Sequence, residues 1–311
     1  MNRRQQFLSQ ERFDNFLKVK KADLEFAKTN LFEADSPEQE KSLRARYFQE
    51  QTLDEILIRY TAGDEIERLV PLLELLVSQY QEVQETLAAS ERVSKIAPLN
   101  LRLLYEYEEC VQVISLCILL HRIDLLRVFV ELFDKAGCAG DDTFYEDLLS
   151  KVLPGRHDVD EWYHEAYTPL VHVIYEEDGE EASDLLKEYC DNWYTSFEQA
   201  PWHDTHLMGD RGSYVGYWAL EAGAVAFLYG INDRAIEHMV YPKDLVEYAR
   251  NYVPINSTGV PRIEAGETCK KTGYWFTPAK SNSRQYFKQG EIMPKIGDSQ
   301  WGDTLWYWSG E

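Results

Sequence analysis

The sequence has few of the features that mark secreted, disulfide-stabilised or membrane-spanning proteins. Its five cysteines are odd in number and form no C-x-x-C pair, which favours free thiols in a reducing compartment. The longest apolar run, residues 111–120, is interrupted by Gln112 and Ser115 and has about half the ~20 residues of a membrane helix. The first residues include two arginines but no apolar stretch of signal-peptide length. We therefore expect a cytoplasmic protein that makes no membrane contact.

Basic residues are also scarce. The chain has 311 residues, of which 54 are acidic and 32 basic, so its formal net charge is −22. This charge disfavours binding to nucleic acids and anionic membranes, and it favours solubility and attraction to basic partners. Residues 141–204 hold eighteen acidic and three basic residues, a net charge of −15. We expect this stretch to form a functional acidic surface, with a merely solvated face as the alternative.

Known catalytic and metal-binding motifs are missing. The sequence contains no Gly-x-Ser-x-Gly, Walker or Gly-x-Gly-x-x-Gly pattern. Glu161 and His164 have the Glu-x-x-His spacing of di-iron carboxylate proteins, but such a site needs this motif twice. His203 and His206 have no third metal ligand close in sequence. We predict no catalytic residue, no metal and no cofactor.

Helical patterns dominate residues 1–255. Ser36 and Pro37 predict the start of a helix that ends near Thr61, because Gly63 follows as a stop signal. Further helices are expected at residues 99–121, 123–136, 143–153, 158–175 and 180–197. The fold class is predicted to be mainly α, a bundle of about nine to eleven helices with a small β-rich tail.

The segment from Tyr214 to Gly230 is predicted to be a central helix. Small residues alternate with aromatic and aliphatic ones, so nearly every face of such a helix is apolar. Glu221 is the only charged residue between these two ends. A buried carboxylate must be paired or hydrogen-bonded, so the partners of Glu221 must come from elsewhere in the chain.

The composition changes near Pro254. Glycines and short aromatic runs such as those around Trp275 and Trp306 predict strands and hairpins after this point. We therefore divide the chain into an N-terminal helical domain at residues 1–95, a second helical domain at 96–255 and a β appendage at 256–311.

The residues that flank the central segment carry a family resemblance. They are Trp193, Tyr194, Trp202, His203, His206, Tyr214, Gly216, Tyr217, Trp218, Glu221, Tyr241, Pro242 and Asp244. Their order and spacing resemble the C-terminal domain of the PoNi family, immunity proteins that protect bacteria against PoNe-type DNase toxins delivered by secretion systems. The run from Arg59 to Asp64 is similar to a turn of the N-terminal PoNi domain.

This resemblance implies a type VI secretion immunity protein that neutralises a PoNe-like DNase by stoichiometric occlusion. The alternative from a different class is a hydrolase that uses a Glu/His/Tyr pocket around Glu221, His203 and His206. The predicted structural role of the motif residues is to pack as core aromatics and to satisfy Glu221.

The predicted partner-binding residues lie in the acidic stretch. Five carboxylates project from the turn at residues 176–181 between two expected helices, where a basic partner would relieve their mutual repulsion. The full predicted set is Glu176, Glu177, Asp178, Glu180, Glu181, Asp184 and Asp204.

Overall fold

The computed structural model describes residues 2–252, 262–277, 280, 283–296 and 304–310. Within these residues the chain forms ten α-helices and four short strands, which confirms the predicted mainly α fold with a small β tail. The chain divides into two compact units, Met1–Arg250 and Asn251–Glu311. A division of the helical unit at residue 95 stays a prediction, and the predicted linker at 256–261 lies outside the described residues.

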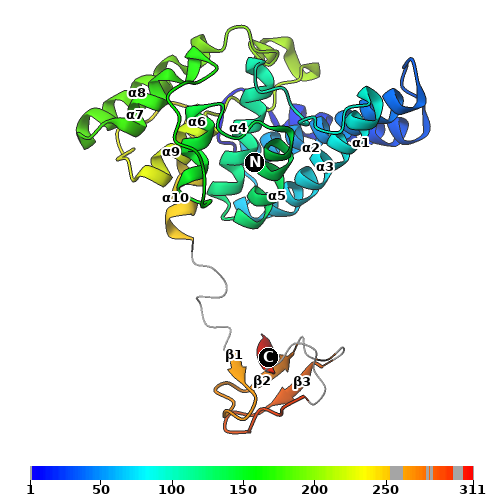
Figure 1. Cartoon of the computed structure of the whole chain (residues 1–311), viewed down its shortest axis with the longest axis vertical. Helices are drawn as coiled ribbons and strands as arrows, with labels where there is room; N and C mark the ends of the chain where they lie inside the picture. Colours follow the sequence, from blue (N-terminus) through cyan, green and yellow to red (C-terminus); the bar gives the residue numbers. More distant parts are fainter. Residues whose placement is uncertain (1, 253–261, 278–279, 281–282, 297–303, 311) are drawn as a thin grey trace. The chain divides into compact units, whose positions relative to one another are not determined.

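The helical unit places its earliest helices at one end and α7 and α8 at the other, with α4 between them (Figure 1). α4 packs against both α5 and α9 and is buried on every side from Cys110 to Leu119. The helices are α1 (Gln10–Thr29), α2 (Pro37–Ala62), α3 (Val70–Glu91), α4 (Leu104–Leu119), α5 (Ile123–Ala136), α6 (Thr143–Ser150), α7 (Thr168–Tyr175), α8 (Gly179–Ser196), α9 (Leu220–Tyr229) and α10 (Lys243–Asn251).

The ends of α2 follow the signals that the sequence carries. The Ser36 side chain accepts a hydrogen bond from the backbone N–H of Gln39, and Pro37 occupies the first helical turn. Gly63 ends the helix with φ 90°, a left-handed conformation that favours glycine. A Cβ atom on Gly63 would lie 1.9 Å from the carbonyl oxygen of Asn2. Glycine is therefore needed here both for the turn and for the close approach of the N-terminal segment.

The predicted central helix at 214–230 is wrong in its first six residues. Residues 214–219 are not helical, and α9 begins only at Leu220. The amide of buried Gln5 accepts a hydrogen bond from the Tyr217 N–H at 2.9 Å and donates one to the Tyr217 carbonyl at 2.5 Å. Gly216 has φ 126°. This long-range amide clamp replaces the intrahelical hydrogen bonds, and local sequence patterns do not contain it.

The predicted helix at 158–175 is also shorter than expected, because only Thr168–Tyr175 is α-helical. The backbone before it bonds to the start of α6 instead. The carbonyl of Glu161 accepts from the Thr143 N–H at 2.8 Å, and the Asp142 side chain accepts from the Tyr163 N–H at 2.8 Å. Residues 158–164 therefore brace the N-terminus of α6.

The second unit contains a four-stranded antiparallel sheet in the order β1-β4-β2-β3. Its strands are β1 (Arg262–Glu264), β2 (Gly273–Phe276), β3 (Gln285–Phe287) and β4 (Leu305–Gly310). Trp275 and Trp306 are fully buried in a core of this unit's own residues, together with Ile263, Cys269, Phe287 and Met293.

Because the β unit has its own core, we expect that ending the chain after Asn256 leaves the helical unit folded. The far-UV circular dichroism per molecule and the melting temperature of the helical transition should change little. A truncated chain that is insoluble or has lost its helical signal would contradict this prediction.

Candidate partner-binding surface

The acidic stretch lies on the surface of the helical unit. Of its eighteen acidic side chains, fifteen are exposed, and the other three are Asp142, Glu146 and Asp147. All seven predicted partner-binding residues are among the exposed ones. α7 and α8 pack against each other at one end of the unit (Figure 1), and the turn between them together with α8 carries eight of the eighteen acidic residues. The stretch can therefore present an electrostatic field to a partner.

The turn between α7 and α8 is less strained by repulsion than the sequence suggests. The Asp178 side chain caps α8 by accepting from the N–H groups of Glu180 and Glu181. Carboxylates in the first turn of a helix interact favourably with its N-terminus, typically by about 0.3–1 kcal/mol each. The helix N-terminus therefore offsets part of the repulsion among Asp178, Glu180 and Glu181 without a basic partner. Glu176 and Glu177 lie at the C-terminus of α7, where negative charge is unfavourable, although Glu176 accepts a hydrogen bond from the Asp178 N–H at 2.9 Å.

Asp204 is not part of this turn. It accepts a hydrogen bond from the Tyr194 hydroxyl at 2.6 Å, and its own N–H donates back to that oxygen at 3.1 Å. Tyr194 lies sixteen residues beyond Asp178 on α8, which corresponds to about 24 Å along the helix axis. The structure thus brings Glu176, Glu177, Asp178, Glu180, Glu181 and Asp184 together at one end of α8 and places Asp204 near the other.

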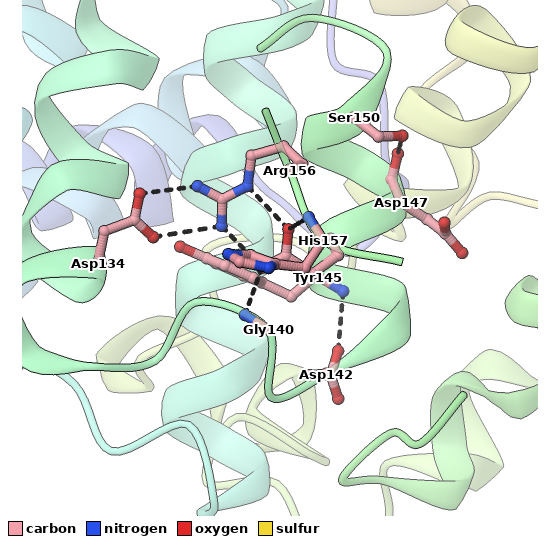
Figure 2. Close-up of polar contacts among 9 residues, drawn as sticks. Asp134, Gly140, Asp142, Tyr145, Asp147, Ser150, Arg156 and His157 are labelled. Atoms are coloured by element: carbon pink, nitrogen blue, oxygen red, sulfur yellow. Dashed lines mark hydrogen bonds and ion pairs between the residues drawn. The ribbon is translucent and has the colours of Figure 1, made fainter. Parts of the chain in front are cut away.

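A buried ionic network links two residues of the acidic stretch, Glu146 and Arg156, to Asp134 on α5. The Arg156 guanidinium donates to both oxygens of Glu146 at 2.8 Å and contacts Asp134 at 2.7 and 3.2 Å (Figure 2). Backbone N–H groups of Gly140 and His157 also donate to Glu146. Burial alone would raise the pKa of Glu146, but these donors outweigh it and lower the pKa. The network ties the loop after α6 to α5 and α6.

Glu221 is 1% exposed and accepts two hydrogen bonds from α8. The Tyr189 hydroxyl donates to its Oε1 at 2.7 Å and the Trp193 Nε1–H donates at 2.8 Å. Burial raises the pKa of Glu221 to about 7, although these donors act in the opposite direction. Glu221 therefore joins α9 to α8 and, at neutral pH, is ionised in part of the molecules.

The aromatic motif residues pack around this link. The Trp193 and Trp202 rings stack with centroids 4.8 Å apart, and the Tyr194 ring stacks on His203 at 4.0 Å. The Tyr217 hydroxyl lies 2.7 Å from His206 Nδ1. These contacts are those of core aromatics whose polar atoms are satisfied.

Among the remaining motif residues, Trp218 and Asp244 contact residues that lie much earlier in the chain. Trp218 Nε1 donates to the Thr61 hydroxyl at 2.8 Å. Asp244 accepts from the Tyr60 hydroxyl and pairs with Arg4. The Tyr241 hydroxyl donates to Asp233, and Tyr214 and Gly216 belong to the non-helical segment before α9. A Cβ atom on Gly223 would lie 2.8 Å from Pro242, so α9 and the start of α10 are in close contact.

The three groups of the alternative hydrolase site have separate partners. Glu221 bonds to Tyr189 and Trp193, whereas His206 bonds to Tyr217 and His203 stacks on Tyr194. Among the described residues, no group of three His, Cys, Asp or Glu side chains has metal-binding geometry. Glu161 is exposed, and His164 Nε2 lies 2.9 Å from the Leu101 carbonyl oxygen.

Glu108 is one of several buried carboxyl groups that the sequence reasoning missed. Glu108 on α4 is 3% exposed and accepts hydrogen bonds from Trp202 Nε1 at 2.9 Å and from the Gln112 amide at 3.2 Å. Burial raises its pKa to about 8, and the nearby charge of Glu221 acts in the same direction. The pair Glu108-Glu109 within an apolar helix was the available sequence signal.

These features define a mainly α-helical protein with many exposed carboxylates and with buried aromatic and carboxyl side chains in its core. In the part of the chain that the structure describes, every helix is too short or too polar to span a bilayer. Residues 140–245 match the family model of PoNe immunity proteins (PoNi), C-terminal. The resemblance predicted for this part of the chain is confirmed, and it supports an immunity role in general. The N-terminal resemblance at 59–64 lies outside the match and stays a prediction.

The fold is also similar to a solved structure, the crystal structure of protein PA2201 from Pseudomonas aeruginosa. The TM-score is 0.62 and the sequence identity is 23%, over 80% of this chain and 92% of that one. This likeness concerns the fold alone. A search of curated proteins finds no significant match.

Proposed function

We propose that this protein is an immunity protein that binds and neutralises a PoNe-like DNase toxin of a type VI secretion system in the cytoplasm. One observation carries the proposal: the match to the PoNi C-terminal model at 140–245 includes the whole acidic stretch, whose acidic side chains are mostly exposed. A nuclease binds phosphodiesters through basic residues, and exposed carboxylates are suited to occupy or cover such a surface. Inhibition is stoichiometric and involves no turnover.

The direct test is expression of the neighbouring open reading frame in a susceptible bacterium with and without this chain. We expect the neighbouring gene alone to degrade DNA and reduce survival, and co-expression of this chain to restore both. The purified pair should form a one-to-one complex. Protection without a complex, at substoichiometric amounts of this chain, would instead favour an enzymatic role.

Neutralising the turn between α7 and α8 should slow association with the toxin. Electrostatic steering accelerates encounter by about ten-fold or more at low salt, and the difference should shrink at high salt. Stability should change by less than about 1 kcal/mol, since the losses at α8 and the gains at α7 oppose each other. Association rates from stopped-flow or biolayer measurements at two salt concentrations check this. The variant carries Glu176→Gln, Glu177→Gln, Glu180→Gln and Glu181→Gln and keeps the Asp178 cap.

A matched control removes the same charge from exposed positions outside the acidic stretch. It carries Glu67→Gln, Glu82→Gln, Glu85→Gln and Glu91→Gln, all on exposed side chains. If both variants associate at equal rates at low salt, the turn contributes only to net charge and is not part of the interface.

A further inference from the structure

A cleft of about 410 Å³ opens between α2, α4 and the segment at 201–218. Arg46, Glu50 and Asp54 line it from α2, where their spacing of four residues places them on one face. Glu108 and Glu109 line it from α4. The cleft lies outside the α7–α8 turn and brings together four carboxyl groups from two helices.

Only two of these four carboxyl groups have a cation as partner. Arg46 pairs with Glu50 at 2.8 Å and with Glu109 at 2.8 Å. Within the described residues, neither Asp54 nor Glu108 forms an ion pair. The cleft therefore already holds one guanidinium between two carboxylates, and it has two further carboxyl groups that form no ion pair within the described residues.

The pKa values of Asp54 and Glu108 are both raised above their usual range. Burial raises the pKa of Asp54 to about 7, although the charge of Lys20 opposes this rise. Lys20 itself is paired with Glu55 at 2.8 Å. The pKa of Glu108 is raised by burial to about 8. A cation that entered the cleft would stabilise the ionised form of both groups, so proton loss and cation binding would favour each other.

Aromatic side chains form the remaining walls. Trp193 and Trp202 line the cleft as a stacked pair, and Trp218 lines it from the non-helical segment before α9. Trp202 also donates its indole N–H to Glu108, which holds this carboxyl group at the wall. Planar rings beside carboxylates suit a guanidinium, which stacks on aromatic faces and pairs with carboxylates in a fork geometry.

We propose that this cleft receives an arginine side chain of the bound toxin, with Asp54 and Glu108 as its acceptors and the tryptophans as its walls. The identity of the partner rests on the proposed function, whereas the recognition of a guanidinium rests on the cleft itself. An arginine seated in an aromatic-lined cleft is the kind of contact that carries much of the energy of a protein interface. The exposed carboxylates of the α7–α8 turn and of α8 then govern encounter, and the cleft governs how long the complex persists.

The cleft can be tested without the toxin. The probes are two capped tripeptides, Ala-Arg-Ala and Ala-citrulline-Ala, which differ in charge but hardly in shape. We expect the arginine peptide to shift the indole N–H resonances of Trp202 and Trp218 saturably, with a Kd in the millimolar range, and the citrulline peptide to cause no saturable shift. Equal responses to both peptides, or none to either, would overturn the proposal.

Substitutions in the cleft provide a second test of the proposal. Asp54→Asn and Glu108→Gln keep the size of each side chain and should each raise the Kd of the arginine peptide about ten-fold. Glu82→Gln, on the exposed surface of α3, should leave the Kd unchanged. Melting temperatures identify any variant that fails to fold, and Asp54→Asn is the decisive variant because Asp54 is partly exposed. An unchanged Kd in folded Asp54→Asn would overturn the assignment.

The co-expression assay then separates this inference from the proposed function. If wild-type chain protects cells and Asp54→Asn with Glu108→Gln does not, the cleft takes part in toxin binding. If the double variant binds the peptide weakly but protects fully, the cleft does not hold a toxin side chain. If the wild-type chain fails to protect while the peptide data hold, the proposed function is wrong and the guanidinium site remains.

Discussion

Replacing Arg156 with leucine is expected to lower the free energy of unfolding of the helical unit by about 3–5 kcal/mol. Arg156 is 8% exposed and Glu146 is 1% exposed, so the substitution leaves a buried carboxylate without its cation. Two backbone N–H groups still donate to Glu146, but they compensate for only part of the loss. Urea unfolding followed by far-UV circular dichroism measures the change.

Two further variants serve as controls for Arg156→Leu. Arg156→Leu combined with Glu146→Gln should recover much of the lost stability, because the unpaired charge is then absent. Lys187→Leu removes a cation that is 45% exposed and pairs with Asp191 on the surface of α8, so its effect on stability should be much smaller than that of Arg156→Leu. Equal, small effects of Arg156→Leu and Lys187→Leu would show that the network in Figure 2 does not support the fold.

Glu221→Leu is expected to cost about 2–4 kcal/mol, because it leaves the Tyr189 hydroxyl and the Trp193 N–H buried without an acceptor. Glu221→Gln should cost less, since its carbonyl oxygen can accept from both donors. Thermal unfolding of the two variants checks the difference. A Glu221→Leu variant that melts within a degree or two of wild type would contradict the role assigned to this link between α8 and α9.

The same residue gives a pH dependence with a defined sign. The pKa of Glu221 is about 7 in the folded protein against a usual value of 4.5, so folding retains a proton that the unfolded chain releases. This contribution to stability is complete below pH 4.5 and is lost as the pH rises through 7. Glu221→Gln lacks it. Relative to wild type, the Gln variant should therefore be more stable at pH 8 than at pH 5, and a constant difference would contradict the elevated pKa.

Local signals in the sequence were sufficient for much of the fold. Ser36 with Pro37 and the glycine at 63 gave the ends of α2, and the ends of α5 at Ile123 and Ala136 agree with prediction. Caps and periodicity act within one or two helical turns, so they can be read directly from neighbouring residues. The acidic character of 141–204 was equally visible, and so was the resemblance that the family match at 140–245 supports.

Contacts between distant residues decided the rest. The sequence required a partner for Glu221, but only the fold supplies Tyr189 and Trp193. Residues 214–219 have a pattern that suits a buried helix, yet Gln5 holds Tyr217 in a non-helical segment from more than 200 positions away.

The cleft also depends on contacts between distant residues. Asp54 and Glu108 belong to different helices, and both line the cleft only because α2 and α4 lie near each other in the folded chain. The start and end of a helix depend on residues that are neighbours in the sequence. The partners of a buried polar group depend on which helices and loops become neighbours in the folded chain. The sequence therefore determined the helices, the charge and the family resemblance of this protein, and the tertiary structure determined which carboxyl groups are paired, buried or available to a cation.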